Sequence, residues 1–254
     1  MDSLRWSTED GIATVWLDNP PVNACTNATY EAIETFFSSA REYLPDARVI
    51  VLTGAGKHFC GGNDLNEFLT MTPENAGARM AQVRASFFAI YDCELPVVGA
   101  VHGVALGTGL AIVASCDVVV ASEDARIGLP EVGVGVMGGA KHASRLLPQQ
   151  LVRYLHLTAE PLPASEFARF GGVLSVVPRE QLMDEAYRVA RLIARHSPVA
   201  LRFAKKSLNT IEYMDIKAGY EFEQGLSGEL SAYADSKEAV NAFFERREPR
   251  YTGA

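Results

Sequence analysis

Three glycine-rich segments of the sequence could place backbone amides around a small ligand. They are Thr53–Asp64, Val101–Gly109 and Ile127–Gly139. Glycine allows positive φ and lets a ligand approach main-chain N–H groups closely. A turn that enters a helix adds unpaired amides at the positive end of the helix dipole. Two such amides that converge on one oxygen form an oxyanion hole, which stabilises developing negative charge.

Other uses of the same glycines fit less well. Gly54-Ala-Gly-Lys57 lacks the upstream glycine of a P-loop, and His58 stands where that loop needs the Ser or Thr that holds Mg²⁺. Gly103–Gly109 lacks both the G-x-G-x-x-G spacing and the later acidic residue of a dinucleotide-binding turn. No G-x-S-x-G elbow occurs, so an α/β-hydrolase triad has no support. Tight strand–helix packing alone would explain any one of the three segments, but not all three together.

The segments around these glycines alternate between strand and helix patterns. Short apolar or alternating runs predict strands at Gly11–Leu17, Val49–Leu52, Pro96–Val101, Val118–Ala121 and Ala125–Ile127. Apolar residues at helical spacing predict helices at Asn27–Tyr43, Ala76–Tyr91 and Leu110–Ala114. This rhythm predicts an α/β fold up to about Val177.

The pattern changes after Pro178. Amphipathic helices without further strands are predicted at Leu182–Ile193, Ala200–Leu208, Tyr220–Tyr233 and Lys237–Glu245. We therefore expect an α/β core over residues 1–178 and a helical region over residues 179–254. The helical region is expected to serve assembly, with packing back on the same chain as the alternative.

Composition limits the classes of function. The chain has 254 residues, 48% of them hydrophobic, which is enough for a sizeable core. Its net charge of −8 argues against sequence-independent binding of nucleic acid, which needs a positive face. No apolar stretch approaches the roughly 20 residues that span a bilayer, and Met1–Asp10 is too polar for a secretory signal.

Cysteine usage points to a reducing compartment. The four cysteines (Cys25, Cys60, Cys93 and Cys116) form no C-x-x-C motif and have no histidine at zinc-binding spacing. Reduced thiols of a cytosolic enzyme are the simplest interpretation. The sequence therefore predicts a cytoplasmic protein that holds no metal and spans no membrane.

Several segments together resemble the crotonase superfamily, also called the enoyl-CoA hydratase/isomerase family. They match it in order and spacing and cover nearly the whole chain: Ile12–Thr26, Gly56–Phe68, Leu95–Ala121, Arg126–Pro148, Ser197–Lys205 and Glu238–Pro249. The resemblance implies an α/β spiral of β-β-α units with a C-terminal helical trimerisation region, assembled as a homotrimer or a dimer of trimers. It also implies an acyl-CoA thioester substrate, with no cofactor beyond the coenzyme A of the substrate itself.

In this family two backbone amides polarise the thioester carbonyl. The resemblance places them at Asn63, within Phe59-Cys-Gly-Gly-Asn-Asp64, and at Thr108, within Leu106-Gly-Thr-Gly109. Holding the carbonyl oxygen stabilises an enolate, so a carboxylate can deprotonate the α-carbon. The residues expected to bind substrate around these amides are Asn23, Cys25, Gly61, Gly62, Asp64, Leu65, Gly107, Gly109, Ala111 and Lys205.

The carboxylates depart from the family pattern. Family hydratases use two glutamates, and Gly128-Leu-Pro-Glu131 matches the second of them. The first falls on Ala111, three residues beyond Thr108, where a helix would return the side chain to the site. A methyl group cannot activate water, so hydration is in doubt. A single acid/base at Glu131 suits double-bond isomerisation, which is the favoured reaction. The alternative is that Glu131 is a surface carboxylate without a catalytic role.

Two other departures leave rival functions open. His142 stands where family members more often have a small residue, and it could replace the lost acid/base. The enzyme would then be a hydratase or a hydrolase of a β-diketone or cyclic β-keto thioester. The simpler interpretation is that His142 is hydrogen-bonded within the protein or faces solvent and has no catalytic role. The last rival is a non-catalytic CoA-ester-binding paralogue. Because Asn66 replaces a frequent basic residue, the candidates to hold the CoA phosphates are Lys205, Lys206, Arg246 and Arg247.

Overall fold

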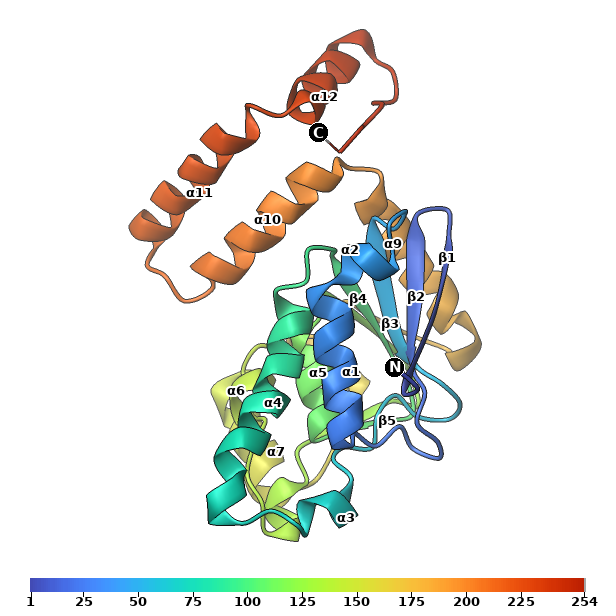
Figure 1. The fold of residues 1–254 in the computed structure, drawn as a ribbon, viewed down its shortest axis with the longest axis vertical. Coiled ribbons are helices and arrows are strands. Elements are labelled where there is room, and N and C mark those ends of the chain that lie inside the picture. Colours follow the sequence, from blue (N-terminus) through green and yellow to red (C-terminus); the bar gives the residue numbers. More distant parts are fainter. Residues whose placement is uncertain (254) are drawn as a thin grey trace.

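A six-stranded sheet lies at the centre of the structure, a computed structural model that describes residues 1–253 (Figure 1). In spatial order its strands are β1 (Leu4–Glu9), β2 (Ile12–Leu17), β3 (Val49–Gly54), β4 (Val97–Val101), β6 (Val118–Ser122) and β9 (Ser175–Val177). Strands β1 and β2 pair antiparallel, and every later pairing is parallel. The parallel strands β3 and β4 are buried throughout, which explains their continuous apolar runs.

A smaller sheet beside it is built from β5 (Val104–Leu106), β7 (Arg126–Gly128) and β8 (Leu162–Pro163). Strands β4 and β6 are each followed by a strand of this smaller sheet, and the chain then enters a helical segment. Those segments are α5 (Thr108–Ser115) and the short 3₁₀ turn η1 (Glu131–Val134). The expected β-β-α repeat is therefore present, and it brings the ends of β5 and β7 side by side.

Helices cover both faces of the large sheet (Figure 1). On one side lie α1 (Asn27–Ser38), α2 (Ala40–Tyr43), α4 (Pro73–Tyr91) and α5, whose buried side chains form the main core. On the other side α9 (Leu182–Ala194) packs its apolar face on β2, β3, β4 and β6. The first helix of the region predicted for assembly is therefore used within the chain. The predicted helix over 27–43 is divided in two at Ser39, which leaves the helical conformation.

The remaining short helices surround the ends of the strands. They are α3 (Leu65–Phe68), α6 (Ala140–Ala143), α7 (Gln149–Thr158), α8 (Ala164–Arg169) and the 3₁₀ turn η2 (Arg179–Gln181). Within residues 1–253, no helix combines the length and apolarity that crossing a bilayer requires.

The last three helices, α10 (Pro198–Ile211), α11 (Ile216–Leu230) and α12 (Ala234–Glu245), project from the core at the top of the view (Figure 1). They expose large apolar side chains, among them Ile216 at 86%, Phe243 at 79% and Phe244 at 76%. Buried apolar surface stabilises association, so an assembly role for these three helices remains the prediction.

Candidate active site

Glu131 lies at the meeting point of two glycine turns. Strand β7 ends at Gly128, and the following turn carries the Glu131 side chain inward, where it is only 7% exposed. A Cβ atom on Gly107 would lie 2.7 Å from Glu131 Oε1, and Gly107 has a φ of +55°. Both facts require glycine at this position. The Gly107 amide donates to the Gly128 carbonyl at 2.9 Å, which fixes the two turns together.

The environment of the Glu131 carboxyl group favours its protonated form. Burial raises its pKa above the ordinary value of a glutamate, against a smaller lowering by its own backbone amide. Oε2 is buried and has no hydrogen-bond partner among residues 1–253. A buried, unpartnered carboxylate facing a cavity is typical of a functional acid or base.

The Asn63 amide is free to face the same space. Cys25 N donates to the Gly62 carbonyl at 2.7 Å, and Asp64 N donates to the Cys25 carbonyl at 2.9 Å. Asn63 lies between these bonds in a parallel bridge, so its own N–H points away from Cys25. Thr108 is the first residue of α5, and its amide is one of those that a helix N-terminus leaves without an intrahelical acceptor.

The Tyr30 hydroxyl joins the side chains of these two residues. It donates to Asn63 Oδ1, and the Thr108 hydroxyl lies 2.6 Å away and donates to it. Tyr30 is completely buried. The neighbouring glycines also touch, because a Cβ on Gly107 would lie 3.9 Å from Gly62 Cα. The structure thus brings the Asn63 and Thr108 turns together beside Glu131.

A cavity of about 330 Å³ opens at this point, and a deeper one of about 80 Å³ continues from it. Asn63, Gly107 and Glu131 line both of them. The other predicted site residues that line one or the other are Gly61, Gly62, Asp64, Leu65, Thr108 and Ala111. Most of the predicted substrate-binding residues therefore surround one space.

Three predicted residues support this space from outside. Asn23 is buried, and its amide group donates to the carbonyls of Ala55 at 2.9 Å and His58 at 2.8 Å. Cys25 is buried and supports Asn63 through the backbone bridge described above. Gly109 lets α5 approach the glycine-rich segment that follows β3, since a Cβ there would lie 2.4 Å from the Cys60 carbonyl.

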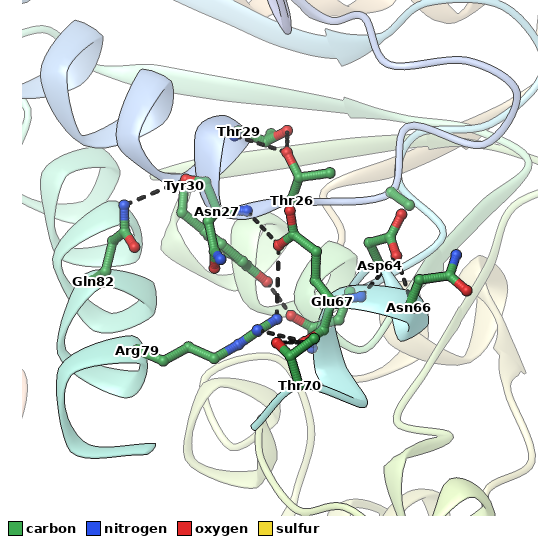
Figure 2. A network of polar contacts seen from close by, with 12 residues as sticks. Thr26, Asn27, Thr29, Tyr30, Asp64, Asn66, Glu67, Thr70, Arg79 and Gln82 are labelled. Carbon is green, nitrogen blue, oxygen red and sulfur yellow. Dashed lines mark hydrogen bonds and ion pairs between the residues drawn. The ribbon is translucent and has the colours of Figure 1, made fainter. Parts of the chain in front are cut away.

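A polar network that the sequence did not indicate fixes the turn after Asn63. Figure 2 shows Asp64 at the start of α3, where its carboxylate accepts from the amides of Asn66 and Glu67. Glu67 Oε2 accepts from the Asn27 amide at 2.8 Å, and Arg79 Nη1 donates to the Glu67 carbonyl at 2.8 Å. The turn is therefore tied to the first residues of α1 and to α4.

Lys205 does not belong to the site, and its predicted role in binding substrate is wrong. Its side chain is buried, and Nζ lies 2.8 Å from Asp117 Oδ2 while donating to the carbonyls of Ile90 and Leu95. All its donors are used inside the protein, so the ammonium group cannot reach a phosphate. Lys205 instead holds α10 to the core.

His142 lies outside the space that Glu131 occupies. It lines neither of the two cavities described above, and its ring meets the Phe87 ring edge to face, with centroids 5.2 Å apart. Phe87 lines the deeper cavity, whereas His142 lies behind the Phe87 ring and does not line it. The geometry does not support His142 as a direct partner of Glu131. Within residues 1–253, no group of three or more potential metal ligands is found.

Comparison with known proteins shows which family has this fold and site. Residues 7–254 match the family model described as enoyl-CoA hydratase/isomerase. The chain belongs to this family. The fold is that of the crotonases, since a crystal structure of an enoyl-CoA hydratase from Bacillus anthracis superposes with a TM-score of 0.92, covering 99% of this chain and 100% of that one, at 28% identity.

Curated members of the enoyl-CoA hydratase/isomerase family carry more than one activity. The chain is 40% identical, over 95% of its length and 93% of the relative's, to a (7aS)-7a-methyl-1,5-dioxo-2,3,5,6,7,7a-hexahydro-1H-indene-carboxyl-CoA hydrolase of Rhodococcus jostii (strain RHA1). It is 34% identical, over 97% of its length and 96% of the relative's, to a short-chain-enoyl-CoA hydratase of Clostridium acetobutylicum. Action on CoA thioesters is common to both, whereas the specific reaction differs.

Proposed function

We propose that this enzyme hydrolyses a carbon–carbon bond of a cyclic β-keto acyl-CoA thioester, using Glu131 as its single acid/base. The observation that carries the proposal is a buried, unpartnered carboxylate opposite Ala111, the position where family hydratases have their other glutamate. Both residues line the deeper cavity. The methyl group of Ala111 takes up less space than a glutamate side chain and offers no second group to hold water.

The similarity to a hydrolase of a bicyclic dioxo-acyl-CoA supports this choice over isomerisation, which the sequence alone favoured. That relative shares 40% identity with the chain, compared with 34% for the short-chain hydratase. The name of that relative specifies a substrate with ring carbonyl groups and a CoA ester. A ring ketone β to the thioester carbonyl is the chemical feature that a lone base next to an oxyanion hole can use.

The proposed reaction balances with water as the only co-reactant. The Glu131 carboxylate removes a proton from water, and the resulting hydroxide adds to the ring ketone. The bond between that carbon and the α-carbon then breaks, and its electron pair becomes a thioester enolate. The amides of Asn63 and Thr108 hold the enolate oxygen. Protonated Glu131 returns its proton to the α-carbon, so one carboxyl group serves as base and then as acid.

Labelled water distinguishes the candidate reactions. A CoA ester of 2-oxocyclohexane carboxylic acid is incubated with the enzyme in H₂¹⁸O, and the products are analysed by mass spectrometry. We expect a ring-opened dicarboxylic monothioester that carries one labelled oxygen in the new carboxylate. Release of free CoA with the ring intact, or recovery of unchanged ester at high enzyme concentration, would contradict the proposal.

Isomerisation is the second candidate, because it needs the same single carboxylate and no water. Glu131 would move a proton between two carbons of an enoyl chain while the amides hold the enolate. A 3-enoyl-CoA ester incubated in ordinary water tests it: the appearance of the ultraviolet absorbance of a conjugated 2-enoyl-CoA, with no gain of 18 mass units, favours isomerisation. Ring opening therefore adds the mass of one water to the cyclic ester, whereas isomerisation moves a double bond at constant mass.

The Tyr30 hydroxyl is expected to matter for turnover although it lies behind the amides. Tyr30→Phe keeps the ring but removes the group that joins Asn63 to Thr108. Loss of a buried hydrogen bond costs about 1–3 kcal/mol, so we expect kcat to fall roughly 5- to 160-fold with little change in KM. Infrared difference spectra of bound acyl-CoA should show a less polarised thioester carbonyl.

Tyr43→Phe is the matched control for this change. Tyr43 stacks on Phe36 with ring centroids 5.2 Å apart, away from the site. It should leave both kcat and the carbonyl frequency unchanged. An equal kcat for Tyr30→Phe and the unmodified enzyme would show that the hydroxyl does not position the amides.

A further inference from the structure

A further cavity of about 300 Å³ lies outside the two active-site cavities and is called the second cavity here. Its aromatic walls are Phe88 and Tyr91, from the C-terminal end of α4, and Tyr213, which follows α10. Lys141 and His142, from α6, contribute polar groups to the same space. None of the residues that line this cavity also lines the cavities around Glu131.

Two contacts place the second cavity directly beyond the deeper active-site cavity. Ala111 lines the deeper cavity, and Ser115, one turn further along α5, lines the second one; a helical turn rises about 5.4 Å. Phe87 lines the deeper cavity, and its ring meets the ring of His142 edge to face. The Phe87–His142 contact therefore links the lining of the deeper cavity to the lining of the second cavity. An acyl group that reaches from one cavity into the other requires a rotamer change of Phe87 or His142.

The polar groups that line the second cavity differ in how many contacts they make within the protein. Arg145 is engaged within the protein. Its Nε donates to Glu212 Oε1 at 3.0 Å, its Nη1 donates to the Ala114 carbonyl, and its guanidinium lies over the Tyr91 ring. Lys141 differs: Nζ lies 4.0 Å from the centroid of the Tyr213 ring and forms no ion pair within residues 1–253. Its ammonium group is free to bind an oxygen.

His142 is the second uncommitted donor. Its ring nitrogens form no hydrogen bond within the part of the chain that the structure describes. Burial, with a smaller contribution from Arg145, lowers its pKa, so the imidazole is neutral at physiological pH. A neutral imidazole can donate one hydrogen bond to a ketone or a carboxylate. Aromatic walls with two free donors at one side fit a ring that bears an oxygen.

We propose that the second cavity is the subsite for the far end of the acyl group, where Lys141 and His142 hold a ketone or carboxylate oxygen. This inference rests on the proposed function, since Glu131 must act on the end of the same acyl group nearer the thioester. A fused bicyclic acyl group would carry its second oxygen one ring farther from the thioester than the ketone that is attacked. Binding of this second oxygen by Lys141 and His142 would make the enzyme selective for oxygenated rings over hydrocarbon chains.

Binding without turnover tests the subsite. In the Glu131→Gln background, titration calorimetry compares CoA esters of one bicyclic skeleton that carry a distal ketone, a distal carboxylate or a distal methylene. Lys141→Met should weaken binding of one or both oxygenated esters roughly tenfold or more, as expected for a hydrogen bond to a charged group. The methylene ester should change less than about twofold. Lys237→Met, an exposed lysine on α12, is the matched control and should change none of them.

The two possible failures are distinguishable. Equal weakening of all three esters by Lys141→Met, or no preference of the Glu131→Gln enzyme for an oxygenated ester, would overturn the subsite. If the unmodified enzyme opens no ring but still binds oxygenated esters through Lys141, the subsite stands and the proposed hydrolysis fails. Ring opening that is indifferent to Lys141 at every ester concentration would reject the subsite alone.

Discussion

Glu131→Gln is expected to lower kcat about 10²- to 10⁴-fold, the range that a positioned acid/base contributes. The amide of glutamine can neither accept a proton from water or an α-carbon nor return one. Its size matches the carboxyl group that lies over Gly107, so the cavity should keep its shape. The Kd for an acyl-CoA ester should therefore change little. Single-turnover kinetics together with calorimetry separate these two quantities.

The stability of the same variant gives an independent measurement. The folded-state pKa of Glu131 is raised, so the protonated form favours folding, and this contribution is lost as pH rises through the folded pKa. Glu131→Gln should thus melt above the unmodified protein at pH 7, by about 2–4 °C for each kcal/mol gained. The gain in melting temperature should vanish below the ordinary glutamate pKa of 4.5.

The matched control is Glu160→Gln, an exposed glutamate in the turn after α7. It should change neither kcat nor the melting temperature. A Glu131→Gln enzyme that keeps more than a tenth of the normal kcat would remove Glu131 from the chemistry and favour a binding role for the chain.

The elements that position the site were predictable because their signals are local. β3 and β4 are buried on both faces and appear in the sequence as continuous apolar runs, and α5 begins where the glycine turn ends. β1 was missed because only Leu4 among its residues is buried, so no alternation marks it. α9 showed its apolar stripe, but the sequence could not tell that a sheet of the same chain would cover it.

The site itself was predictable where backbone groups and glycines determine it. Gly62 and Gly107 adopt positive φ, at +111° and +55°, a conformation that favours glycine. The glycines in the sequence therefore marked the two turns. Tyr30 gave no such signal, because it shares helical spacing with core residues and only its hydroxyl reaches Asn63 and Thr108. The sequence also cannot distinguish a lysine that binds a phosphate from one buried against a carboxylate. Lys205 was misassigned for that reason.

Lys205→Met is expected to destabilise the protein by about 3 kcal/mol. The Lys205 side chain is 6% exposed and that of Asp117 is 24% exposed, which places the effect at the lower end for a buried ion pair. Asp117 would keep its bond to the Val97 amide but lose its cation, and the carbonyls of Ile90 and Leu95 would lose a donor. The melting temperature should fall by about 6–12 °C. Thermal unfolding followed by circular dichroism measures it.

Two further variants separate charge burial from lost packing. Lys206→Met changes the exposed neighbour and should leave the melting temperature within about 2 °C. The double variant Asp117→Asn/Lys205→Met removes the uncompensated charge, so it should melt above Lys205→Met alone. If it instead melts lower by the full cost of a second independent change, the pair contributes no coupling. In that case packing of the lysine stem, rather than the ion pair, would hold α10 and the projecting helices on the core.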